Sequence, residues 1–170
     1  MEQKLNYSTT DAKNKLKFLI KELSMCLLST KLKSGEAAVT RPMSAYISES
    51  DDFIWFFSQR DSNKNREIEN GNYVQLYFSD AAKSTYFSIA GTAEIILNDR
   101  NKIDELWNPF LKTWFQDGKE DENLSLIKVT PDTGYYWDTK GNRIINLFKM
   151  AASVVLGKDL VNGEEGKLKF

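Results

Sequence analysis

The chain has 170 residues, a formal net charge of −1, 41% hydrophobic residues and 28% charged residues. This composition is typical of a folded globular domain and gives no overall positive charge to attract nucleic acid or acidic membranes. With no histidine and a single cysteine, the chain cannot contain a Ser-His-Asp or Cys-His nucleophile pair, an imidazole metal site or a thiolate cluster within one copy.

The N-terminal part is predicted to contain one helix followed by strands. Residues 8–11 supply helix-start residues, and apolar side chains follow at helical spacing, so this helix should end near Ser24. The predicted elements after it are strands at 25–30, 36–43, 45–48 and 53–58, and a helix from about 62 to 70 that Gly71 ends.

The C-terminal part is predicted to consist mainly of strands. Gly91 lies inside the longest of them and predicts a bulge or a tight bend. Asp99 should cap a helix that Pro109 ends or kinks. The expected elements are strands at 73–79, 85–97, 124–130, 134–137 and 143–148, an irregular aromatic segment at 107–119 and a polar tail at about 157–170.

These elements predict a mainly β fold with flanking helices, formed by one domain over residues 1–170. The long, bent strand favours a small antiparallel barrel over a flat sheet. The apolar runs are too short to cross a bilayer, residues 1–15 lack the apolar segment of a signal peptide, and Cys26 lies in an apolar run. We therefore expect a buried thiol and a cytoplasmic protein.

A polar loop after an aromatic strand is the first candidate site. Strand 53–58 runs into a loop that carries Ser58, Arg60, Ser62 and Lys64, and a helix begins there. Hydroxyls, cations and free amides at a helix start are what a phosphate group needs, and the strand offers flat aromatic surface. The pattern favours a phosphorylated planar cofactor. The alternative is an ordinary solvated connection between a strand and a helix.

Two further features allow a functional and a structural interpretation. In Thr40-Arg-Pro-Met43, the proline belongs on an edge strand, where the arginine could face an anion or a ring. The alternative is an edge protected against aggregation. The four tryptophans are more typical of a core or a subunit interface than of a cofactor site. They are Trp55, Trp107, Trp114 and Trp137.

Several segments, taken in order, resemble the pyridoxamine-phosphate-oxidase-like, FMN-binding split-barrel flavoproteins, and in particular their bacterial general-stress-protein branch. The similarity extends over nearly the whole chain. Its segments are Thr40-Arg-Pro-Met43, Trp55-Phe-Phe-Ser-Gln-Arg-Asp-Ser-Asn-Lys64, Phe87-Ser-Ile-Ala-Gly-Thr-Ala-Glu94, Glu105-Leu-Trp-Asn-Pro-Phe110, Val129-Thr-Pro131, Tyr135-Tyr-Trp-Asp138 and Gly163-Glu-Glu-Gly-Lys167.

The resemblance implies a six-stranded antiparallel split barrel that forms a homodimer, with FMN in two symmetry-related clefts at the interface. Asn63 stands where the family has an arginine, for which Arg60 could substitute, and Ser88 stands where the oxidases commonly carry one. The cofactor contacts that it implies are Arg41, Pro42 and Met43 beside the isoalloxazine, Phe57 and Ser58 near the ribityl chain and phosphate, Ser62, Asn63 and Lys64 at the phosphate, Trp107 in the segment distinctive of the branch, and Tyr86, Ser88 and Trp137 from the partner subunit.

The substrate positions differ from those of the true oxidases. The oxidases hold pyridoxal phosphate with an arginine and a histidine, and here these positions are Arg143 and Ile145. Because isoleucine can neither form a hydrogen bond nor transfer a proton, FMN binding without efficient oxidation of pyridoxamine phosphate is expected. The expected function is a stress-related oxidoreductase that reduces a small-molecule redox partner with a nicotinamide nucleotide. The alternatives are a non-catalytic flavin-binding stress or sensor protein, and a haem binder, which the lack of histidine disfavours.

Overall fold

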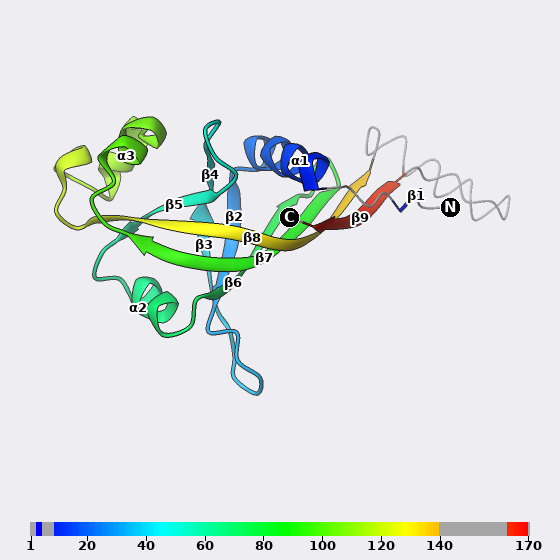
Figure 1. Cartoon of the computed structure of the whole chain (residues 1–170), viewed down its shortest axis with the longest axis horizontal. Coiled ribbons are helices and arrows are strands. Elements are labelled where there is room, and N and C mark those ends of the chain that lie inside the picture. Colours follow the sequence, from blue (N-terminus) through cyan, green and yellow to red (C-terminus); the bar gives the residue numbers. More distant parts are fainter. Residues whose placement is uncertain (1–2, 5–8, 140–162, 170) are drawn as a thin grey trace, which may run out of the picture.

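Strands dominate the computed structural model, which describes residues 3–4, 9–139 and 163–169 (Figure 1). In these residues one curled sheet contains β1 (Gln3–Lys4), β2 (Met25–Thr30), β3 (Val39–Ser44), β4 (Tyr46–Ile47), β5 (Ile54–Gln59), β6 (Tyr73–Asp80), β7 (Thr85–Ile96), β8 (Leu124–Thr139) and β9 (Gly163–Lys169). The helices outside it are α1 (Thr9–Glu22), α2 (Asn63–Asn70) and α3 (Arg100–Leu106), followed by the 3₁₀ helices η1 (Pro109–Thr113) and η2 (Gly118–Glu120).

The long strands form an antiparallel sheet in the order β3–β2–β6–β7–β8–β5. The sheet curls until β3 lies near β5, which is the geometry of a split barrel. Strand β8 pairs with β5 along its first half and with β9 along its second half. The mainly β, antiparallel split barrel is therefore confirmed. The strand count is larger than the predicted six, because β4, β9 and the parallel β1 extend the sheet.

Two of the predicted elements need correction. Residues 124–130 and 134–137 belong to one strand, β8, because Pro131 lies opposite Gly91 at an irregularity of the β7–β8 ladder, where proline does not interrupt the pairing. Within the predicted polar tail, Gly163–Lys169 forms β9, because its backbone pairs with the second half of β8. The strand predicted at 143–148 lies outside the described residues.

Gly91 lies where β7 and β8 approach each other closely. The register between β7 and β8 shifts between Ala90 and Gly91, as predicted. A Cβ atom at Gly91 would lie 2.2 Å from the carbonyl oxygen of Thr130 on the neighbouring strand. Only glycine allows the two backbones to approach so closely.

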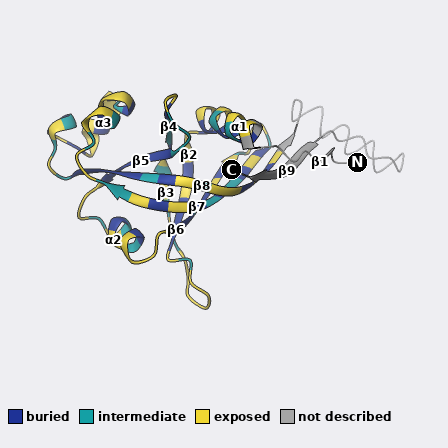
Figure 2. Ribbon diagram, in the orientation of Figure 1, coloured by how far each residue is buried: buried dark blue, intermediate teal, exposed yellow. Residues whose placement is uncertain are grey.

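Two hydrophobic cores hold the fold together. The first fills the space between α1 and the curled sheet, and it includes Leu16, Ile20 and Cys26. The second joins α3 and η1 to the ends of β5 and β8. Figure 2 shows the buried stretches of β5 and β8 running beneath these helices. Burial raises the pKa of the Cys26 thiol to about 12, so the predicted buried thiol is confirmed.

Among the described residues, no helix combines the length and the apolar character needed to span a membrane. The same residues contain no group of three or more potential metal-ligating side chains.

Candidate functional site

A cleft of about 560 Å³ lies where β3, β5, the start of α2 and the η1 segment meet. Its size falls in the range of small-molecule sites. The lining residues are mostly apolar or aromatic, with several hydroxyls and amides, one cation and no carboxylate: Met25, Pro42, Met43, Ser44, Tyr46, Phe57, Ser58, Gln59, Lys64, Asn108, Phe110, Leu111, Trp114 and Phe115.

Lys64 is the cation of this cleft, in the first turn of α2. Its side chain is half-buried, and no described carboxylate lies within ion-pair distance of it. Burial, and then the nearby positive charge of Arg41, lower the pKa of Lys64. The first backbone amides of a helix add further positive potential at this place. The free protein therefore holds an uncompensated positive charge, which an anionic ligand group would neutralise.

A buried hydrogen-bond network fixes the corner that carries Lys64. Ser58 Oγ donates to Asn65 Oδ1 at 2.6 Å, and Asn65 Nδ2 donates to Ser125 Oγ at 2.9 Å. Ser125 Oγ in turn donates to the backbone oxygen of Ser58 at 2.9 Å. Ser62 precedes α2, and its hydroxyl lies 3.3 Å from Ser58 Oγ. The Ser58 hydroxyl donates its hydrogen to Asn65 and so has no hydrogen left to donate to a ligand in the cleft. Its role in this structure is to orient the start of α2.

An aromatic floor lies beneath the cleft. The ring of Phe57 makes edge contacts with Tyr46 at 5.3 Å and with Trp107 at 5.8 Å between ring centroids. Trp107 packs against the second core and is not among the residues that line the cleft. Trp107 therefore contacts Phe57 without lining the cleft itself.

Three other predicted positions point away from this cleft. The Arg41 guanidinium lies 2.7 Å from Glu67 Oε2 and donates to Thr30 Oγ1 at 3.1 Å. Asn63 Oδ1 accepts a hydrogen bond from Arg66 at 2.6 Å, and Arg60 donates to Asn98 Oδ1 at 3.1 Å. Nearby polar partners thus hold these side chains.

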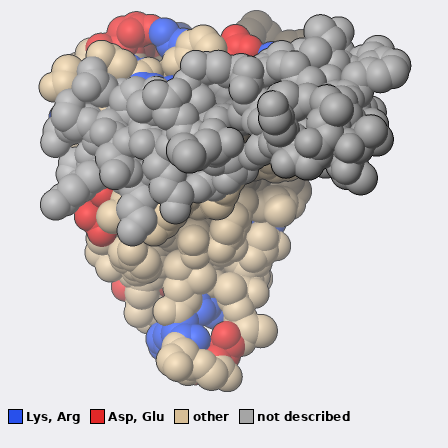
Figure 3. Space-filling model, turned by 90° about the vertical axis from the view of Figure 1, so that its right-hand side faces the viewer, with Lys and Arg blue, Asp and Glu red and all other residues tan. Residues whose placement is uncertain are grey.

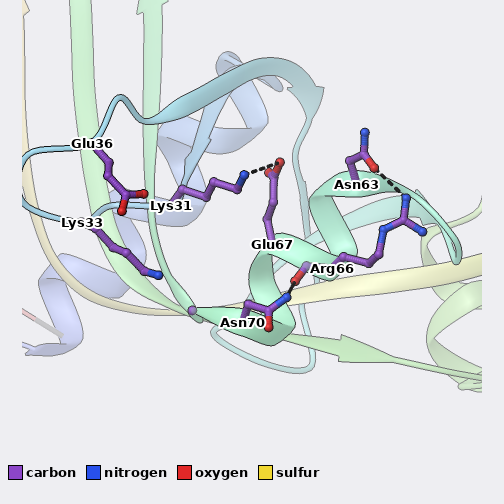
Figure 4. Close-up of a pocket in the computed structure, with 8 residues that line it drawn as sticks. Lys31, Lys33, Glu36, Asn63, Arg66, Glu67 and Asn70 are labelled. Atoms are coloured by element: carbon purple, nitrogen blue, oxygen red, sulfur yellow. Dashed lines mark hydrogen bonds and ion pairs between the residues drawn. The ribbon is translucent and has the colours of Figure 1, made fainter.

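Asn63 and Glu67 belong to a second cavity of about 500 Å³, lined by polar and charged residues and Gly71, between α2 and the β2–β3 turn (Figure 4). Lys31 from that turn lies 4.0 Å from Glu67 Oε1. Burial disfavours the charged form of Glu67, but hydrogen bonds from Thr30 and Arg41 and the charges of Arg41 and Lys31 outweigh it and lower its pKa. Two carboxylates, Glu36 and Glu67, lie among the cations of this cavity, whereas no described carboxylate lines the cleft beside Lys64.

The remaining predicted contacts lie on the outer face of the sheet. A depression of about 630 Å³ there includes Tyr86, Ser88 and Trp137, and it shares Met25 and Pro42 with the first cleft. One lateral row across β2, β6, β7 and β8 is formed by Leu27, Tyr77, Ser88 and Tyr135. Figure 3 shows a broad, mostly uncharged surface above a tip that carries basic side chains and an acidic one.

Part of the cleft was missed from the sequence. The lining residues outside the predicted set are Met25, Ser44, Tyr46, Gln59, Asn108, Phe110, Leu111, Trp114 and Phe115. The signal for several of them is the aromatic segment at 107–119, which was interpreted only as irregular structure. Arg143, the predicted substrate residue, and Ile145 lie outside the described residues.

Comparisons with known proteins agree with this architecture. A family model described as pyridoxamine 5'-phosphate oxidase like matches residues 11–161. Protein bli-3 of Neurospora crassa is 26% identical over 113 residues, which are 62% of this chain and 54% of that protein. The chain thus spans about half the length of this curated relative.

Solved structures show the same fold. A protein of Jannaschia sp. CCS1, provisionally named general stress protein 26, superimposes with a TM-score of 0.76 at 23% identity, over 96% of this chain and 100% of that chain. The general stress FMN/FAD binding protein of Xanthomonas citri is 28% identical with a TM-score of 0.64, over 79% of this chain and 93% of that chain.

Proposed function

The chain belongs to the pyridoxamine 5'-phosphate oxidase-like family, and from this premise we propose that it binds FMN and acts as a cytoplasmic, stress-related oxidoreductase. Lys64 is the observation that carries the proposal. It is a half-buried cation without a described carboxylate partner, in a cleft with aromatic walls. A planar ring that carries one phosphate group matches both the cation and the aromatic walls. The name of the Xanthomonas citri relative supports a flavin as that group.

The residues present fit the parts of FMN. Lys64, Ser62 and the first amides of α2 would hold the phosphate through charge-assisted hydrogen bonds. Pro42, Met43 and Phe57 would contact the ring system. The bound flavin supplies the electron or hydride transfer. The protein's own contribution is to bind and orient this group and to exclude water from it with apolar walls.

FMN titration tests the proposal. Adding FMN to the flavin-free protein is expected to quench flavin fluorescence with a stoichiometry of one FMN per chain, and the purified complex should be yellow. A protein that leaves FMN fluorescence unchanged throughout the titration would rule out the proposed cofactor. A haem-type absorption band would instead support the tetrapyrrole alternative.

Turnover is tested separately from binding. Mixing the FMN complex with NADH or NADPH without oxygen should bleach the flavin absorbance if the protein is an oxidoreductase. A complex that stays yellow would favour the non-catalytic stress or sensor protein. Pyridoxamine phosphate should be oxidised poorly in either case, because Ile145 replaces the family's histidine.

A homodimer would complete the proposed site. Leu27, Tyr77, Tyr86, Tyr135 and Trp137 are 42–47% exposed on one sheet face. A second copy would cover this apolar face and bring the partner subunit's Tyr86, Ser88 and Trp137 to the cofactor.

Leu27→Arg is expected to weaken dimerisation at least about 100-fold, because an unpaired charge buried in an interface costs several kcal/mol. Sedimentation of the variant over a concentration series measures the effect. The matched control is Leu97→Arg, since Leu97 is 49% exposed in the connection after β7 and lines neither the cleft nor the depression. Unchanged sedimentation of Leu27→Arg would exclude this sheet face as the interface.

A further inference from the structure

Phe110 and Trp114 are the most exposed of the large hydrophobic side chains in the described part of the chain, at 82% and 61%. Both line the proposed cofactor cleft. Such exposure of two aromatic rings at one site is unfavourable in water. It marks a surface that a ligand or a partner covers.

Buried neighbours hold these two rings in place. Leu111 and Phe115, each one residue further along the chain, are 5% and 2% exposed and anchor η1 in the second core. Asn108 Oδ1 accepts a hydrogen bond from the Phe110 backbone at 3.1 Å, and Asn108 Nδ2 donates to the Tyr46 hydroxyl at 2.9 Å. The rings therefore project from a fixed support.

The helix before η1 is also anchored. Asp99 caps α3 by accepting from the Lys102 backbone at 3.0 Å. The Lys102 ammonium lies 2.8 Å from Asp51 on the β4–β5 turn and 2.6 Å from Glu105. These contacts fix α3 against the sheet, so the position of η1 is set from both sides. An aromatic surface of this kind is preorganised for a rigid ligand.

We propose that Phe110 and Trp114 form the stacking surface for the planar ring of the redox partner, a neutral or anionic aromatic compound of the nicotinamide or quinone class. This inference rests on the proposed function, in which Pro42, Met43 and Phe57 contact the flavin and leave the η1 wall free. Aromatic rings prefer stacked or edge contacts with other rings. Among the described residues that line the cleft there is no carboxylate that would attract a cationic ligand. The amides of Gln59 and Asn108 offer partners for a carbonyl or carboxamide group.

The test uses the oxidised FMN complex and 1,4-naphthoquinone-2-sulfonate, a planar anion whose binding is expected to change the flavin absorbance. Trp114→Ala is expected to weaken its binding about tenfold, the size of one lost ring contact. Trp114→Phe, which retains a ring, should stay within about threefold of the parent. Phe18→Ala is the control, because Phe18 is 57% exposed on α1 and outside the cleft. Cyclohexanesulfonate, a non-planar anion, should bind alike to the parent and to Trp114→Ala.

Each outcome separates this inference from the proposed function. Unchanged naphthoquinone affinity in Trp114→Ala, with FMN still bound, would overturn the inference alone. A tenfold loss of FMN affinity in that variant would overturn it too, because the ring would then contact the flavin itself. A shift to monomers in the variant would assign the rings to the subunit interface instead. If the parent protein does not bind FMN at all, the proposed function and the inference both fail.

Discussion

Replacing Lys64 with glutamine is expected to weaken FMN binding by about 1.5–3 kcal/mol, or roughly 10- to 100-fold, the range for a hydrogen bond to a charged group. The reason is that Lys64 is the one side-chain cation among the described lining residues of the cleft, and that Arg41 is paired with Glu67. Fluorescence titration of flavin-free protein with FMN measures the change. Riboflavin, which lacks the phosphate, should bind the parent and Lys64→Gln about equally.

Two variants control for general charge effects. Lys33→Gln removes an exposed lysine from the polar cavity of Figure 4 and should leave FMN affinity unchanged. Lys64→Arg should recover part of the lost affinity, because it restores a cation at the start of α2. Full FMN affinity in Lys64→Gln would show that the phosphate binds elsewhere.

The pH dependence of FMN binding has a defined sign. Burial and the charge of Arg41 lower the pKa of Lys64 in the free protein. FMN affinity should therefore fall as the pH rises through that lowered pKa, which lies below the ordinary lysine value of about 10.4. Bound phosphate favours the ammonium form and shifts the pKa upward again, so FMN binding at alkaline pH should be accompanied by proton uptake. Lys64→Gln should not show this part of the pH dependence.

Gly91→Ala is expected to reduce the free energy of unfolding by about 3 kcal/mol, the upper end of the typical range for overpacking a rigid site. The new Cβ atom would lie 2.2 Å from the Thr130 carbonyl oxygen. The obstacle is backbone, so no side-chain rotation can relieve the clash, and β7 and β8 must separate locally. Thermal unfolding should show a midpoint lowered by about 6–12 °C for a chain of this size.

Gly71→Ala is the matched control for this substitution. Gly71 follows α2 with an extended backbone (φ −173°), and apart from its chain neighbours no atom lies within 4 Å of the position that a Cβ atom would take. Its stability change should stay within about 0.5 kcal/mol, as for ordinary surface substitutions. If Gly91→Ala were equally mild, the close approach of β7 and β8 would not be a constraint on this fold.

Local sequence signals predicted the fold well at positions where a single residue determines the backbone conformation. Asp99 caps α3, Gly71 follows the last turn of α2, and Gly91 lies at the ladder irregularity. The continuity of β8 could not be predicted in this way. Pro131 indicates a break when considered alone, and only the bulge on the neighbouring strand allows it inside a long ladder. The pairing of β9 with β8 is likewise a contact between distant segments, which no local pattern indicates.

The candidate site was predictable in part for the same reason. The loop after β5 indicated a place for an anion, and Lys64 has the environment that this requires. Arg41 was predicted beside the isoalloxazine and Asn63 at the phosphate, yet each side chain has a polar partner from α2, Glu67 and Arg66 respectively. Side-chain pairing of this kind depends on tertiary geometry. Phe110 and Trp114 were missed because the sequence does not show on which side of η1 an aromatic ring lies. That side decides whether the ring lines the cleft or packs in the core.

The burial of Cys26 determines how this molecule would withstand oxidants. Thiolates react with peroxides and disulfides, whereas neutral thiols scarcely do. With a pKa of about 12 and 3% exposure, the only sulfhydryl of the chain stays protonated and out of reach at physiological pH. The chain therefore offers no reactive thiol, and two copies cannot become cross-linked through Cys26. A redox role for this chain would therefore depend on a bound group and not on its cysteine.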